Sequence, residues 1–133
     1  MVSEETLIAY EVLYSGYRLA YSYGHSQDYD LIADVDSRLL KIQVKTGINT
    51  RKRQYEMRLR DKDEYDADHV DLFASAAHPE NAAFYAPFDQ TSESQRVTFT
   101  PPAEMSSDAN RERANMTEDY SLEAVLPRVC NVK

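Results

Sequence analysis

The chain has 133 residues, 42% of them hydrophobic and ten of them tyrosine, which excludes a disordered tail and fits one domain over residues 1–133. Its apolar runs are too short to span a membrane, and its acidic start lacks the pattern of a secretion signal, so we expect a cytoplasmic protein. A lone cysteine, Cys130, excludes an internal disulfide and a zinc site built from cysteines.

The charge of the chain is unevenly distributed. The net charge is −8, but residues 38–60 hold eight basic side chains against Glu56 alone, so this segment carries +7 and the rest carries −15. A basic stripe on an acidic protein is typical of phosphate contact, although such a run can also be a solvated surface. The excess of acid, with arginine preferred to lysine, indicates a halophilic source such as a salt-loving archaeon or its virus.

The first half of the chain reads as one helix followed by strands. Ser3 is a suitable N-cap, Glu4 and Glu5 fit the first helical turn, and Gly16 is a suitable stop. The pattern predicts a helix over 3–15, strands over 17–21, 29–34 and 39–46, a loop over 23–28, a polar turn over 34–38 and a flexible basic loop or turn over 47–53.

The second half is less regular. It predicts a weak strand over 54–60, a short helix or loop over 61–69, strands over 70–74 and 82–86, an edge strand over 96–100 within the polar segment 89–117, and a terminal helix over 117–125 capped by Thr117. The order of elements predicts an α/β (α+β) fold in which helices pack on a central mixed sheet.

Three polar residues on two neighbouring predicted strands form the candidate chemical site. Asp30 stands near the start of one strand, and Gln43 and Lys45 stand two apart on the next, so that period two places these two on one face. A carboxylate and an amide oxygen suit a hard cation such as Mg²⁺, and an ammonium group can orient the attacking water or stabilise a phosphorane-like transition state. The set therefore predicts phosphodiester hydrolysis.

These residues resemble the PD-(D/E)XK nucleases, with Gln43 where the second acidic residue usually stands. The order of Glu5, Tyr29-Asp30-Leu31 and Gln43-Val44-Lys45-Thr46 resembles the branch of group I intron homing endonucleases. The resemblance implies a restriction-endonuclease-like core and a catalytic set of Glu5, Asp30, Gln43 and Lys45. Within that set, Asp30, Gln43 and Glu5 would hold the metal, and Glu4 is an adjacent alternative to Glu5.

Other side chains have simpler interpretations. Lys41, Arg51, Lys52 and Arg53 are predicted to contact DNA, the last three as a phosphate clamp beside the cleavage point or, alternatively, as an exposed basic turn. Four further residues are expected to have structural roles: His25 in a loop, Asp34 and Asp36 in a turn, and Asp71.

The resulting hypothesis is a Mg²⁺-dependent DNA endonuclease of homing or mobile-element type, in which Mn²⁺ can substitute. Its substrate would be double-stranded or branched DNA, and a homodimer or homotetramer is expected because one site cuts one strand. The alternatives are a nuclease similar to Holliday-junction resolvases, a DNA-binding protein that kept the scaffold without the chemistry, and an acidic interaction protein.

Overall fold

The computed structural model describes residues 3–21, 29–59, 70–77, 80, 82–90, 94–99, 104–105 and 115–130. In chain order its main elements are α1 (Glu4–Tyr14), β1 (Arg18–Tyr21), β2 (Leu31–Val35), β3 (Arg38–Val44), β4 (Gly47–Arg51), β5 (Gln54–Arg58), β6 (Leu72–Ala77), β7 (Ala82–Pro87), η3 (Phe88–Gln90), β8 (Ser94–Thr98), η5 (Thr117–Tyr120) and α3 (Leu122–Cys130). No helix in these ranges is long and apolar enough to cross a membrane.

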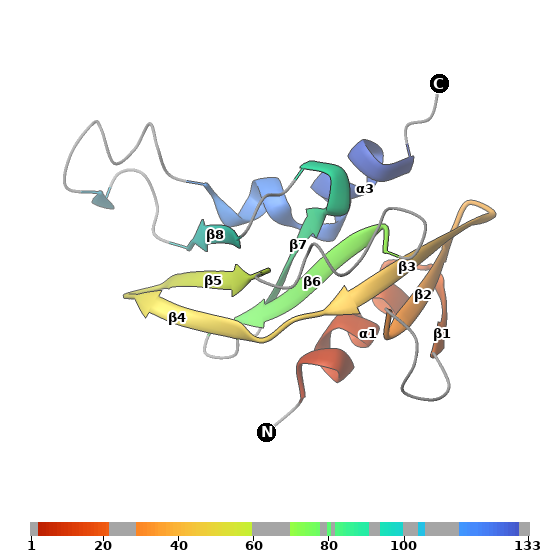
Figure 1. The fold of residues 1–133 in the computed structure, drawn as a ribbon, viewed down its shortest axis with the longest axis horizontal. Helices are drawn as coiled ribbons and strands as arrows, with labels where there is room; N and C mark the ends of the chain where they lie inside the picture. The colour runs from red at the N-terminus through yellow and green to blue at the C-terminus, as the bar shows by residue number, and fades with distance from the viewer. Residues whose placement is uncertain are drawn as a thin grey trace.

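The first sheet has five strands in the order β1-β2-β3-β6-β7 (Figure 1). Its first three strands form an antiparallel meander, β3 pairs with β6 in parallel, and β6 pairs with β7 in an antiparallel manner. The β2–β3 turn is only two residues long, and Asp36 and Ser37 take φ values of 53° and 72°, as a tight hairpin turn requires. The predicted α+β class with a mixed sheet is confirmed, as is the place of Asp36 in a turn. Asp34 was predicted in the same turn but lies inside β2 opposite Leu39, because the strand pairing continues to Val35.

A second sheet, with the order β4-β5-β8, corrects two expectations. The predicted loop over 47–53 is instead the strand β4 and the turn that joins it to β5, and the strands do not all belong to one sheet. The turn forms at Lys52 and Arg53, and the Asn49 side chain donates to the backbone oxygens of Arg51 and Gln54. The basic composition suggested flexibility, but hairpin pairing satisfies the backbone locally.

The described residues form three layers, with α1 and α3 on one face of the five-stranded sheet and the second sheet on the other. Alternation along β6 and β7 divides their side chains between two cores. One core joins Ile8 and Val12 of α1 and Val125 of α3 to the helix-facing side chains of the sheet. The other lies between the sheets and contains Phe73 and Phe84 with Tyr55, Met57 and Val97. Because β6 and β7 are covered on both faces, both strands are almost wholly buried.

The ends of α1 agree with the predictions, whereas the start of α3 does not. Ser3 caps α1 by accepting from the backbone N–H of Thr6, and Gly16 has a φ of 96° just past its end, as expected. The terminal helix instead begins at Leu122, after the 3₁₀ turn η5, where Ser121 Oγ accepts from the backbone N–H of Ala124. The Thr117 hydroxyl donates to the Thr98 carbonyl and does not cap this helix.

The remaining strand predictions are confirmed with small shifts of boundary. The strand predicted over 54–60 is β5, the two predicted over 70–74 and 82–86 are β6 and β7, and the predicted edge strand is β8. The expected loop over 23–28, which contains His25, and the helix or loop over 61–69 lie outside the described residues.

Candidate active site

Asp30 lies just before β2 and forms hydrogen bonds with the backbone at the end of β3. Its backbone N–H donates to the Ile42 carbonyl at 2.8 Å, so the pairing of the two strands extends by one residue. Its side-chain Oδ2 accepts from the backbone N–H of Val44 at 2.8 Å. Hydrogen bonding through one carboxylate oxygen fixes the side chain and leaves Oδ1 outside this contact. The Asp30 carboxylate is therefore held half-buried at the carboxyl end of β3.

Gln43 and Lys45 lie on either side of Val44 and share the face that looks toward the second sheet. Gln43 is directly opposite Phe73 of β6, and its amide Nε2 lies 3.5 Å from the Val44 carbonyl oxygen, at the limit of hydrogen bonding. The Lys45 ammonium nitrogen lies 6.0 Å from the centre of the buried Phe73 ring. The Asp30 and Gln43 side chains thus both contact the backbone of Val44, and Lys45 is its direct neighbour.

The first turn of α1 also reaches this end of β3, through Glu4. The Glu4 Oε2 atom accepts from the backbone N–H of Gly47 at 2.8 Å, two residues after Lys45. Glu5 lies half-buried in the same helical turn. The assignment of Glu5 to the active site stays a prediction, while the contact of Glu4 gives that residue a definite role in holding the crossover from β3 to β4.

Gly47 is required where the chain passes from one sheet to the other. A Cβ atom at this position would lie 2.3 Å from the carbonyl oxygen of Ala76 and 2.8 Å from Ser75 Oγ, so no side chain fits. This close approach brings the start of β4 directly over β6 and fixes the path of the chain immediately after Lys45.

The oxygen donors near Val44 fit a hard divalent cation. Among the described residues, no three His, Cys, Asp or Glu side chains are grouped closely enough to hold a metal ion. Mg²⁺ nevertheless needs few protein ligands, since it keeps several waters and is commonly held by one or two carboxylates together with substrate phosphates. The Asp30 carboxylate, the Gln43 amide oxygen and the Val44 carbonyl oxygen are donors of the right kind, and neither sulfur nor imidazole is among them.

The predicted DNA contacts fall in two different places. Lys41 lies on β3, two residues before Gln43, with its ammonium 5.9 Å from the centre of the Tyr29 ring and its backbone N–H bonded to Asp71. Asp71 thus has the structural role expected for it. The other three residues, Arg51, Lys52 and Arg53, surround the β4–β5 turn at the far end of the second sheet (Figure 1).

The role of Arg51, Lys52 and Arg53 as a phosphate clamp beside the cleavage point stays a prediction, and it would have to act from the β4–β5 turn. At about 3.3 Å per residue, an extended strand carries Lys52 roughly 20 Å from Lys45. The Arg53 guanidinium is engaged by both carboxylate oxygens of Glu80 at 3.1 Å, and this hydrogen bonding raises the pKa of Arg53 above its ordinary value. Arg51 and Lys52 remain exposed.

Two polar clusters were not found from the sequence. In the first, Glu11 of α1 accepts from the Tyr85 hydroxyl at 2.7 Å and from the backbone N–H of Ala83 at 3.2 Å, at the edge of β7. Burial, followed by the negative charge of Glu11, raises the pKa of Tyr85 well above its ordinary value. The helical spacing was the available signal, because Glu4, Ile8 and Glu11 at i, i+4 and i+7 share one helix face.

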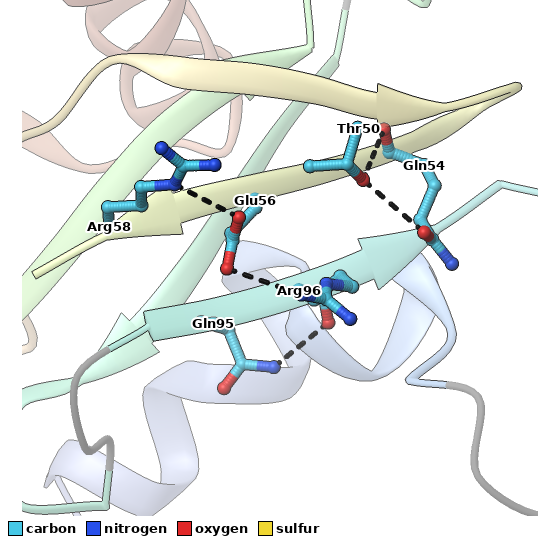
Figure 2. Close-up of polar contacts among 6 residues, drawn as sticks. All are labelled: Thr50, Gln54, Glu56, Arg58, Gln95 and Arg96. Carbon is cyan, nitrogen blue, oxygen red and sulfur yellow. Dashed lines mark hydrogen bonds and ion pairs between the residues drawn. The ribbon is translucent and has the colours of Figure 1, made fainter.

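The second cluster surrounds Glu56 of β5 (Figure 2). The residue is only 7% exposed, and its carboxylate contacts Arg58 Nε at 3.2 Å and an Arg96 terminal nitrogen at 3.5 Å. Burial raises the pKa of Glu56, but the hydrogen bond from Arg58 and the charge of Arg96 outweigh it, so the pKa lies below its ordinary value. Glu56 is the one acid in the basic segment, and that isolation was the signal in the sequence.

Two hollows in the described surface lie away from Asp30, Gln43 and Lys45. One of about 430 Å³ is bounded by the end of α1, the β2–β3 turn and α3, and one of about 110 Å³ lies near Asp71 and Arg128. A site that cuts a polymer lies on an accessible surface, so the absence of Asp30, Gln43 and Lys45 from these two hollows does not conflict with the chemistry inferred above.

The family model described as PD-(D/E)XK endonuclease matches residues 3–123. The fold is similar to that of the bacterial homing endonuclease I-Ssp6803I, with 20% identity, a TM-score of 0.64 and coverage of 80% of this chain and 78% of that one.

A second solved structure, the Holliday junction resolvase Hjc of Archaeoglobus fulgidus, is similar at 16% identity with a TM-score of 0.46, covering 71% of this chain and 80% of that one. No curated protein matches the sequence. Since the family model spans nearly the whole chain, this protein belongs to the PD-(D/E)XK endonuclease family.

Proposed function

We propose that this protein is a Mg²⁺-dependent endonuclease that hydrolyses phosphodiester bonds of double-stranded DNA, as an enzyme of homing or mobile-element type. The observation that supports it most is the gathering of the Asp30 carboxylate and the Gln43 amide around the backbone of Val44, directly beside Lys45. Family membership supports the reaction class, and the basic segment 38–60 supports a polyanionic substrate.

In this mechanism, Asp30 and Gln43 hold the cation, Glu5 assists them, and Mn²⁺ can replace Mg²⁺. The bound cation supplies charge neutralisation at the phosphate and lowers the pKa of water. The Lys45 ammonium, carried on a stem beside Phe73, donates to the attacking water or to a phosphoryl oxygen and so orients the reactants in line. Lys41, on the same strand face, and the exposed Arg51 and Lys52 contribute phosphate contacts.

The direct test is cleavage of supercoiled plasmid and of a synthetic four-way junction, with Mg²⁺, with Mn²⁺ and with chelator, at low and high salt. The wild type is expected to cut plasmid only with metal, and Lys45→Met, which keeps an apolar stem beside Phe73, is expected to bind DNA without cutting. Lys52→Met is the matched control: it lies at the β4–β5 turn and should weaken DNA binding while retaining the maximal rate.

Preferred cleavage of the junction over the plasmid would favour a resolving enzyme instead. A second candidate function, DNA binding without chemistry, is favoured by the replacement of an acid by Gln43 and by the lack of a three-acid cluster in the described part of the chain. Metal-independent binding by the wild type, with no cleavage under any of these conditions, would establish it. Absence of DNA binding at every salt concentration would support the remaining hypothesis, an acidic interaction protein.

We also propose that the active form is a homodimer or homotetramer. One active site cuts one strand, so a double-strand break requires a second site on a symmetry-related copy. Light scattering of the purified protein with and without DNA tests this, and a protein that is monomeric in both states yet makes double-strand breaks without nicked intermediates would contradict it.

A further inference from the structure

The outer face of the second sheet carries an ordered array of polar side chains that the catalytic proposal does not use. Alternation along β5 turns Tyr55 and Met57 into the core and leaves Gln54, Glu56 and Arg58 on the opposite side. Arg96 of β8 lies directly opposite Glu56 in the register. Figure 2 shows these side chains on β5 and β8 of the second sheet.

The array is centred on a buried carboxylate that holds two arginines side by side. Glu56 uses one oxygen for Arg58 Nε and the other for an Arg96 terminal nitrogen, while the two arginine side chains remain 46% and 57% exposed. The contact through Nε leaves both terminal nitrogens of Arg58 outside it. Two guanidinium forks are therefore fixed on a solvent-facing strand surface, and less conformational freedom is lost when they bind a ligand.

Stability alone does not account for this arrangement. Exposed ion pairs contribute little, and burying a carboxylate carries a desolvation cost, so an uncharged β-branched residue would suit the centre of this face better. The neighbouring Thr50 hydroxyl and Gln54 amide are also in contact, at 3.3 Å. The surface is thus a mixed set of oriented donors and acceptors rather than a uniformly basic one.

We propose that the outer face of β4-β5-β8 reads base edges in the major groove of DNA, with Arg58 and Arg96 as guanine-reading side chains and Glu56 as the residue that positions them. The inference rests on the proposed function in taking DNA as the partner. Arginine forks match guanine O6 and N7, and a glutamine amide matches adenine. The major groove is about 12 Å wide and admits two paired strands, and the β5–β8 pair measures about 5 Å between strand axes.

Base reading differs from phosphate contact in a way that an arginine-to-lysine exchange reveals. Lysine keeps the charge beside Glu56, and hence the non-specific attraction, but loses the fork. The cluster pairs two arginines with one glutamate. A surface that only contacts phosphates would be expected to carry arginines without a neighbouring acid, so the presence of Glu56 supports base reading.

The experiment selects sequences from a randomised DNA duplex pool with the full-length protein in chelator, so that binding is measured without cleavage. The affinity for the selected duplex is then compared with that for the unselected pool. Arg58→Lys and Arg96→Lys should each reduce this ratio about tenfold or more, with non-specific affinity within about twofold of wild type. Arg18→Lys, an exposed arginine of β1, is the matched control and should leave the ratio unchanged.

Glu56→Gln tests the positioning role separately. Release of the two arginines should lower the ratio while non-specific affinity stays the same or rises, because one negative charge is removed. A Glu56→Gln protein that melts at a lower temperature but keeps the wild-type ratio would overturn the positioning role. A double Arg58→Lys, Arg96→Lys protein with the wild-type ratio, or a wild type without sequence preference, would overturn the whole inference.

Mg²⁺-dependent plasmid cleavage by the same proteins distinguishes this inference from the nuclease proposal. A wild type that shows arginine-dependent preference but never cuts contradicts the nuclease and supports the reading face. A wild type that cuts with a preference independent of both arginines supports the nuclease and contradicts the reading face.

Discussion

The side chain of Asp30 accepts a hydrogen bond of 2.8 Å from the backbone N–H of Val44, so the candidate metal ligand also completes the pairing at the end of β3. The Asp30 carboxylate therefore has two proposed roles, metal binding and hydrogen bonding to the backbone, and substitutions can separate them. We expect Asp30→Asn to keep the hydrogen bond through its amide oxygen and to fold normally, while cleavage falls about a hundredfold or more through loss of the charged ligand.

Asp30→Ala provides the contrast. It removes both functions, and the unsatisfied N–H of Val44 should lower the free energy of unfolding by about 1–3 kcal/mol. Urea unfolding and plasmid cleavage measure the two effects, and equal stability of the Asn and Ala variants would argue against the structural role of this hydrogen bond.

Gln43 can be tested by restoring the acid that the family pattern usually has. Gln43→Glu adds a carboxylate beside Asp30, so the Mg²⁺ concentration for half-maximal cleavage should fall by about tenfold, the order expected for an added charged ligand. Gln43→Leu should abolish cleavage. Gln95→Glu, on β8, is the control and should not change the Mg²⁺ dependence; equal shifts in both glutamate variants would indicate a general charge effect.

The two glutamates at the start of α1 are expected to differ. Glu4→Ala leaves the N–H of Gly47 without its acceptor and should cost about 1–3 kcal/mol of stability. Glu5→Gln should leave the melting temperature unchanged and reduce metal-dependent cleavage. If Glu4→Gln reduces cleavage at unchanged stability while Glu5→Gln does not, Glu4 is the helix acid of the active site.

Gly47→Ala is expected to be strongly destabilising. The added methyl would meet the backbone oxygen of Ala76 at 2.3 Å, and a backbone atom cannot move aside as a side-chain end can. A loss of about 3 kcal/mol or more is expected, at the upper end of overpacking effects. Thr46→Ala changes an exposed neighbour and should stay within about 0.5 kcal/mol. Urea unfolding of the two variants measures the difference, and similar values would refute the close approach.

Glu56 should contribute a pH-dependent part of the stability. Its pKa is lower in the folded state than in the unfolded state, so its contribution is fully present above pH 4.5, the ordinary value, and is lost as pH falls through the lowered folded-state value. The difference in melting temperature between wild type and Glu56→Gln should therefore be constant from pH 7 to 5 and shrink below pH 4.5. A difference in melting temperature that grows as the pH falls would mean that folding raises the pKa of Glu56, and it would contradict the pairing of Glu56 with Arg58 and Arg96.

Local patterns in the sequence determined much of this protein. Alternation in the predicted strand over 39–46 placed Gln43 and Lys45 on one face, and the Ser3 cap and the Gly16 stop bounded the first helix, because these signals act through neighbours in the chain. The pairing of the strand after Asp30 with the next strand also followed from the short predicted turn over 34–38. The two-residue length of that turn, and the register that it sets, came from the structure. The family resemblance rested on these same residues.

The tertiary structure alone decided which sheet each strand joined and which acids faced inward. The segment 47–53 has the composition of a loop, but it forms β4 because β5 offers a partner and Gly47 allows the crossing over β6. Likewise, Glu4, Glu11 and Glu56 are ordinary surface residues by type, and their acceptor roles depend on donors 43, 72 and 40 positions away in sequence. Contacts at such separations are set by packing, which local spacing does not encode.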